Sequence, residues 1–233
     1  MLSISKLLKK TGHQIFINIL TVMGVSVGWS LFLVPVLFIL PYHLALIFFA
    51  LTFIPVTVAV YAVIHHLLSK NKASLALFVR FFFRYYKRAL LLSVFFLLAV
   101  LIPISEWWYY LKINDSYFIF IFATFQTYFC LTFLATQVYA IPFLVIKDLG
   151  TFAAMNQSIK HFMQHKGYTI GLFIQILSVT ALLSLTVIGF FLLYIGMLAV
   201  FVLNATNNLQ LHHQQHQQKN EQSEKNPILI NEQ

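Results

Sequence analysis

The stretch that decides the fold class is ALLLSVFFLLAVLIPIS, residues 89–105. Twelve of its side chains are Leu, Ile, Val or Phe, and none is charged. At about −0.3 to −0.6 kcal/mol each, those twelve favour insertion into a bilayer by roughly 4 to 7 kcal/mol. A charge near the centre would cancel about 3 kcal/mol of this gain, and the stretch has none. It is therefore predicted to be a membrane-spanning helix.

The composition of the whole chain agrees with a membrane location. Of its 233 residues, 60% are hydrophobic and 9% are charged, whereas a soluble domain carries about a quarter charged residues. Such a chain cannot cover a water-facing surface. Its net charge is +9, and the cations lie mostly between apolar runs, where they would meet anionic lipid headgroups. Because no nucleic-acid-binding motif accompanies them, nucleic acid is not an expected partner.

Five apolar stretches are long enough to cross a bilayer. They are residues 15–40, 44–68, 89–105, 117–146 and 169–203. As one helix the last stretch would measure about 52 Å, against a hydrocarbon core of roughly 30 Å. Two short helices that turn near Ile188–Gly189 fit better than one tilted helix. The prediction is an all-α, polytopic transmembrane bundle with six spans, and five spans are the alternative.

Basic residues are concentrated in alternate connections between these stretches. They are Lys6, Lys9 and Lys10 in the first segment, Lys70, Lys72, Arg80, Arg84, Lys87 and Arg88 in the second, and Lys147, Lys160 and Lys166 in the third. The connections between them offer only Lys112. Since cations favour the cytoplasmic side, this alternation predicts a cytoplasmic N-terminus. Lys219 and Lys225 favour the same side for the C-terminus, as an even number of spans requires.

Three regions follow from these patterns. Residues 1–14 form a basic amphipathic N-terminal segment, residues 15–203 the transmembrane domain, and residues 204–233 a polar tail. Because the tail is rich in Asn, Gln and His and poor in apolar side chains, it is expected to be disordered beyond its first turn. The connecting segments 73–88 and 154–166 are expected to be amphipathic helices at the cytoplasmic interface or extensions of the next span.

Cations in the first connecting segment share one helical face. The i, i+4, i+7, i+8 spacing of Arg80, Arg84, Lys87 and Arg88 aligns them. Each cation near an anionic membrane surface contributes about 1 kcal/mol of attraction. This face is therefore a candidate contact for anionic lipid.

Two further patterns lie within the spans. Gln126, Cys130 and Gln137 are spaced to share one polar face of the fourth apolar stretch, which predicts interhelical hydrogen bonds or a solute path. Cys130 is the single cysteine, so no internal disulfide is possible. Gly24 and Gly28 form a G-x-x-x-G motif, which favours close helix packing within the chain or in a dimer.

No catalytic or metal-binding motif accompanies these patterns. The sequence has no H-E-x-x-H zinc motif and no G-x-S-x-G nucleophile elbow, and no Asp or Glu lies centrally in an apolar stretch. Pairs of histidines one turn apart occur, but neither a carboxylate nor a thiolate completes a ligand set. The expectation is no enzymatic activity, no metal and no cofactor.

Residues 28–96 resemble the YesL-like family of bacterial membrane proteins, whose function is unknown. The motifs that carry the likeness are Trp29, Val34-Pro35-Val36, Pro55-Val56-Thr57-Val58-Ala59-Val60-Tyr61, the Phe-rich run 78–83 and Lys87-Arg88-Ala89. Residues 140–142 and Asn156 are similar to the family's second half. The likeness covers about three-quarters of the chain. Pro35 and Pro55 lie further apart than in the family, and the extra residues are expected to complete a hairpin.

The family is often associated with carbohydrate-uptake gene clusters. The resemblance implies a non-enzymatic accessory or scaffold protein of the bacterial inner membrane, near carbohydrate uptake or envelope processes. Its expected partners are membrane lipids and a transporter or other membrane protein. The alternative is a stand-alone small-solute transporter or channel, for which the polar face of the fourth stretch would line the path.

Overall fold

The computed structural model describes residues 4–70, 73–113 and 116–225, and all regular structure within them is helical. The helices are α1 (Ile4–Ile17), α2 (Ile19–Ile39), α3 (Tyr42–Lys70), α4 (Leu75–Lys112), α5 (Tyr117–Thr136), α6 (Ala140–Ile146), α7 (Thr151–Gln164), α8 (Lys166–Leu185) and α9 (Val187–Lys225). Five apolar helices are long enough to cross a membrane, and the bent α1–α2 pair supplies a sixth. The predicted all-α transmembrane bundle is confirmed.

Helix α1 is the expected amphipathic segment, and it is separate from the first span. It meets α2 at an angle of 86°. Leu7 and Thr11 are buried on one side of α1, whereas Lys9 and Lys10 are exposed on the other. This division suits a helix that lies along an interface with its cations in water. The helix runs to Ile17, slightly beyond the expected boundary at residue 14.

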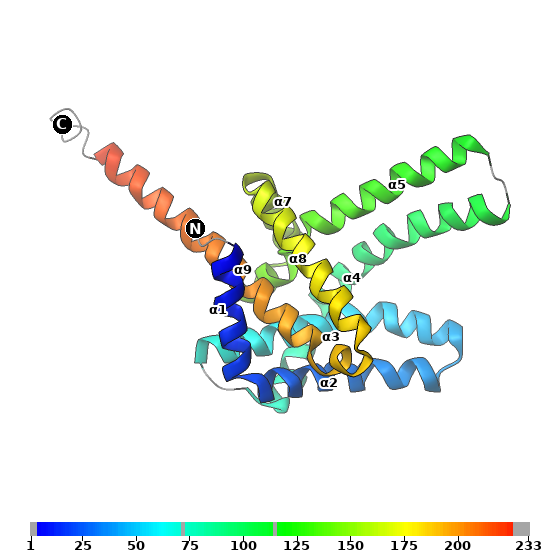
Figure 1. The fold of residues 1–233 in the computed structure, drawn as a ribbon, viewed down its shortest axis with the longest axis horizontal. Coiled ribbons are helices and arrows are strands. Elements are labelled where there is room, and N and C mark those ends of the chain that lie inside the picture. The colour runs from blue at the N-terminus through cyan, green and yellow to red at the C-terminus, as the bar shows by residue number, and fades with distance from the viewer. Residues whose placement is uncertain (1–3, 71–72, 114–115, 226–233) are drawn as a thin grey trace.

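Helix α3 is the centre of the bundle. Every residue from Ile54 to Ile64 is buried, and α3 packs against α2, α4, α6 and α9. Trp29 of α2 donates its indole N–H to Thr57 Oγ1 of α3 at 3.1 Å, which satisfies the one polar atom of that side chain. Figure 1 shows the α2–α3 and α4–α5 hairpins extending toward the right of the view.

The expected fourth span, residues 117–146, is divided in the structure. Helix α5 ends at Thr136, and the short helix α6 begins at Ala140. Ser158 of α7 stabilises the break, because its hydroxyl donates to Thr136 O at 2.6 Å and accepts from Tyr139 N at 3.2 Å. A single side chain thus replaces helical hydrogen bonds on both sides of the break.

The last apolar stretch forms two helices, as expected. Helix α8 ends at Leu185 and α9 begins at Val187, immediately before the predicted turn at Ile188–Gly189. A Cβ on Gly189 would lie 2.6 Å from Thr186 Oγ1, so a larger residue there would require this hydroxyl to move. Five candidate spans lie in α3, α4, residues 117–146, α8 and α9, and the count reaches the predicted six where the bent α1–α2 pair is taken as one span.

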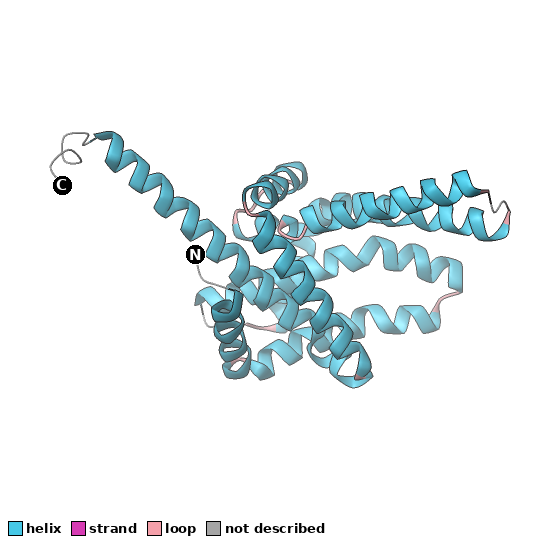
Figure 2. Ribbon diagram, turned by 45° about the horizontal axis from the view of Figure 1, so that its top comes forward, coloured by secondary structure: helices cyan, strands magenta, loops and turns pink. Residues whose placement is uncertain are grey.

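The prediction that the tail is disordered beyond its first turn is wrong as far as Lys225. Helix α9 continues to Lys225 and projects beyond the rest of the molecule (Figure 2). Asn204 is buried and donates its amide N–H to Thr11 Oγ1 at 3.1 Å and Gln14 Oε1 at 2.6 Å. Asn208 donates to Tyr168 Oη at 3.3 Å. Polar composition alone predicted disorder here, but these amides form hydrogen bonds with residues of α1 and α8.

The two connecting segments fold differently. Residues 75–88 are a continuous extension of α4, whereas the second segment forms the separate helix α7. On α7 the buried positions are Thr151, Ala154, Ser158 and His161. The ring of His161 packs against Phe143 with their centroids 4.9 Å apart, so this face holds α7 against α6.

Candidate functional site

The predicted lipid-binding face lies at the start of α4, and an acidic residue interrupts it. Arg84 Nη2 lies 2.9 Å from Asp148 Oδ2, and Arg88 Nη1 lies 2.7 Å from Asp148 Oδ1. The side chains of Arg84, Arg88 and Asp148 are 56%, 44% and 46% exposed, respectively. Ion pairs this exposed contribute about 0–1 kcal/mol each to stability. Their main effect is therefore on local charge.

Asp148 also fixes the loop between α6 and α7 to α4. Arg88 Nη1 donates to the carbonyl of Asp148 at 3.0 Å, and Thr151 Oγ1 donates to the carbonyl of Arg88 at 2.8 Å. Asp148 adopts a φ of 50°, in the left-handed region that Asp tolerates better than most residues. Of the four predicted cations, Arg80 and Lys87 are exposed and form no ion pair in the described parts of the chain.

The three residues of the predicted polar face lie in α5 and directly after it. Gln126 is half-buried and Cys130 is buried, both within α5, but Gln137 follows the last residue of that helix. That the three side chains share one face stays a prediction. Gln137 is 2% exposed, and within the described residues neither amide atom has a hydrogen-bond partner. The break at residues 137–139 was not predicted, because the uncharged stretch 117–146 continues through it.

The G-x-x-x-G packing of Gly24 and Gly28 stays a prediction, and a close glycine contact within the described chain occurs at Gly196. A Cβ on Gly24 would meet no atom within 4 Å, so Gly24 brings no helix of the described chain into close contact. Gly28 is half-buried. At Gly196 of α9, in contrast, a Cβ would lie 2.6 Å from Ser26 Oγ and 2.7 Å from Val22 O. Gly196 N donates to Ser26 Oγ at 3.0 Å, so α2 and α9 make the close crossing.

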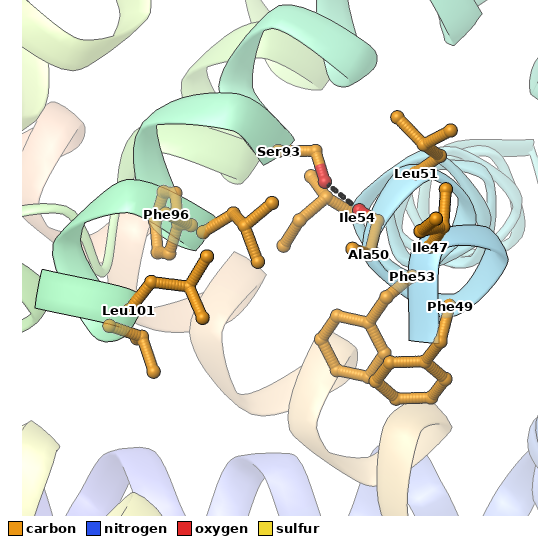
Figure 3. A pocket seen from close by; sticks show the side chains of 11 residues that line it. Ile47, Phe49, Ala50, Leu51, Phe53, Ile54, Ser93, Phe96 and Leu101 are labelled. Atoms are coloured by element: carbon orange, nitrogen blue, oxygen red, sulfur yellow. Dashed lines mark hydrogen bonds between the residues drawn. The ribbon is translucent and has the colours of Figure 1, made fainter. Parts of the chain in front are cut away.

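An apolar groove with a volume of about 580 Å³ lies between α3 and α4. Figure 3 shows its lining residues and the hydrogen bond from the Ser93 hydroxyl to the Ala50 carbonyl. The lining residues are Ile47, Phe49, Ala50, Leu51, Phe53, Ile54, Ser93, Phe96, Leu97, Val100 and Leu101. The sequence alone does not indicate this groove, because the groove depends on how α3 and α4 pack against each other.

No arrangement typical of a metal centre is present in the part of the chain that the structure describes: no three His, Cys, Asp or Glu side chains gather there. Compared with models of known protein families, with curated proteins and with solved structures, the chain matches none. The class defined by the fold is a polytopic helical membrane protein. The YesL-like resemblance stays a prediction from the sequence motifs.

Proposed function

We propose that this chain is a non-enzymatic accessory or scaffold protein of the bacterial inner membrane. It would assist another membrane protein near carbohydrate uptake or envelope processes. The observation that carries this proposal is the exposed surface of α5. Its aromatic side chains at positions 117, 118, 125, 128 and 129 are each more than 60% exposed. A helix held mainly by α4 offers this surface to lipid or to a partner's helix.

The interior of the bundle supports a scaffold over a solute path. Its central helix α3 is buried and largely apolar from Ile54 to Ile64. Of the buried polar groups, Gln137, Ser158 and Asn204 lie near helix ends that carry basic residues. Hydroxyls buried within the spans, such as those of Ser26 and Thr57, donate to the backbone of their own helices. The absence of enzymatic activity is proposed from the sequence, which places no carboxylate centrally in a span.

The proposed orientation places the basic helix ends in the cytoplasm. Asn204 links α9 to α1, Asn208 links α9 to the start of α8, and Asp148 links the α6–α7 loop to the start of α4. These contacts lie next to the basic segments, which the positive-inside rule assigns to the cytoplasmic side. Reporters fused after Lys10 and after Lys166 should both be cytoplasmic.

Site-specific photo-crosslinking in native membranes tests the proposed role. A photoactivatable amino acid at Phe125 or Phe129 of α5 should capture the same membrane protein from both positions. The matched control is Ile174, which is 56% exposed on α8 and should capture lipid. Capture of lipid alone from all three positions would contradict a scaffold role for α5.

A flux assay separates the alternative function. Purified protein in sealed vesicles should move no sugar or small solute, because an accessory protein lacks a path of its own. Flux that is lost in a Gln126→Leu variant would instead support the stand-alone transporter.

A further inference from the structure

We infer that the groove between α3 and α4 is a binding site for one acyl chain of a membrane phospholipid. This site is independent of the accessory role proposed above. The groove lies at the depth of the hydrocarbon core, because its α4 side, from Ser93 to Leu101, is centred within the apolar stretch 89–105. Headgroups do not reach this depth, so only the tails of lipids or another helix can occupy it.

The groove has a buried floor and an exposed rim. Ile54 and Ser93 are 7% and 3% exposed, whereas Ile47, Leu51 and Leu101 are 58%, 40% and 48% exposed. The rim therefore opens sideways toward the bilayer rather than into the bundle. Figure 1 shows the α2–α3 and α4–α5 hairpins diverging toward their turns.

The lining provides no polar group for water or a polar ligand. Ser93 has the one polar side chain of the lining, and its hydroxyl donates to the Ala50 carbonyl (Figure 3). A buried water needs two to four polar partners. The groove is therefore suited to an apolar occupant.

The bulk of the lining favours a flexible chain over a partner's helix. Close helix packing in membranes needs small residues that let two backbones approach. Here the only small residues, Ala50 and Ser93, are bonded to each other, and the remaining nine are Phe, Leu, Ile or Val. From Ser93 to Leu101 the groove extends about 12 Å along α4, less than half of a spanning helix of about 30 Å. A polymethylene chain can follow such an irregular surface, whereas a rigid helix would contact its rim.

The test uses the full chain in vesicles of phosphatidylethanolamine and phosphatidylglycerol, with a small fraction of phosphatidylcholine that carries a diazirine on one acyl chain. After irradiation, labelled peptides are mapped by mass spectrometry. Residues 47–54 and 93–101 should carry about fivefold more label than equally exposed segments of α5 and α8, because the groove contacts more of the acyl chain's surface. Even labelling of all lipid-facing helices would overturn the inference.

Filling the groove gives a second, matched comparison. Ala50→Trp should reduce the groove label by about tenfold, because the indole occupies space that several methylene groups would otherwise fill. The control is Ala181→Trp, the same change at an exposed position of α8, which should leave the groove label unchanged. Leu97→Trp fills the groove from its other wall and serves if Ala50→Trp does not fold. Groove label that survives in a folded filling variant would overturn the inference.

Discussion

Substituting Gly196 by alanine should destabilise the bundle, although alanine is the better helix former. The added Cβ would lie 2.6 Å from Ser26 Oγ, 2.7 Å from Val22 O and 2.8 Å from Val22 Cγ1. One of these atoms belongs to the backbone, so rotation of a side chain cannot remove the overlap. Overpacking of this kind costs about 1–3 kcal/mol.

Two further effects set the net change. Separation of the helices would weaken the hydrogen bond from Gly196 N to Ser26 Oγ, with a loss of about 0.5–1.5 kcal/mol. Alanine's higher helix propensity returns about 1 kcal/mol. The variant should therefore lose about 0.5–3.5 kcal/mol of unfolding free energy.

Gly24→Ala is the matched control. Because its Cβ would meet nothing within 4 Å, this variant should gain up to about 1 kcal/mol from helix propensity alone. Unfolding in mixed detergent micelles with increasing SDS, followed by circular dichroism, measures both variants. Reaction of the single, buried Cys130 with a maleimide dye is an independent probe of opening. Equal stabilities for the two variants would refute the close crossing of α2 and α9.

Three other perturbations test separate contacts. Ser158→Ala should lower the free energy of unfolding by about 2–4 kcal/mol, because two backbone groups at the α5–α6 break lose their hydrogen-bond partner. Thermal unfolding measures this loss. The control Ser178→Ala, on an exposed face, should stay within about 0.5 kcal/mol of the parent. Asn204→Leu removes the hydrogen bonds that hold α1 against α9. Hydrogen exchange of the α1 amides should accelerate by about tenfold for each 1.4 kcal/mol of lost local stability. The control Asn207→Leu should leave the exchange rates unchanged. Asp148→Asn should change the free energy of unfolding by less than about 1 kcal/mol. The same variant should increase the amount of phosphatidylglycerol that co-purifies with the protein at low salt. No increase would show that Arg84 and Arg88 are unavailable to lipid.

Some features of this protein depend on the solvent preference of each segment and were predictable. An uncharged run such as residues 89–105 prefers hydrocarbon wherever it is placed in the chain. A run of 35 residues from Thr169 to Leu203 is too long for one crossing, and the break at Thr186 confirms the predicted turn. The amphipathic α1 was predictable for the same reason, since its spacing separates cations from apolar side chains.

The polar and small residues were not predictable in this way, because their contributions come from partners far away in the chain. Asn204 has the composition of a disordered tail until Thr11 and Gln14 are beside it. Gly196 has no recognisable motif, and its role appears only where Ser26 crosses it. Asp148 could have been singled out, since it is the one acid in a basic connection.

The amino-acid sequence by itself determined that the chain is helical and which of its stretches are apolar enough to cross a membrane. The free energy of transfer from water to lipid is a sum over the residues of one segment, so the sequence of that segment is enough to estimate it. The tertiary structure alone decided which helices cross closely, where the fourth span breaks and where the acyl-sized groove opens. Those features depend on distances between atoms that are remote in sequence, and no local sum contains them.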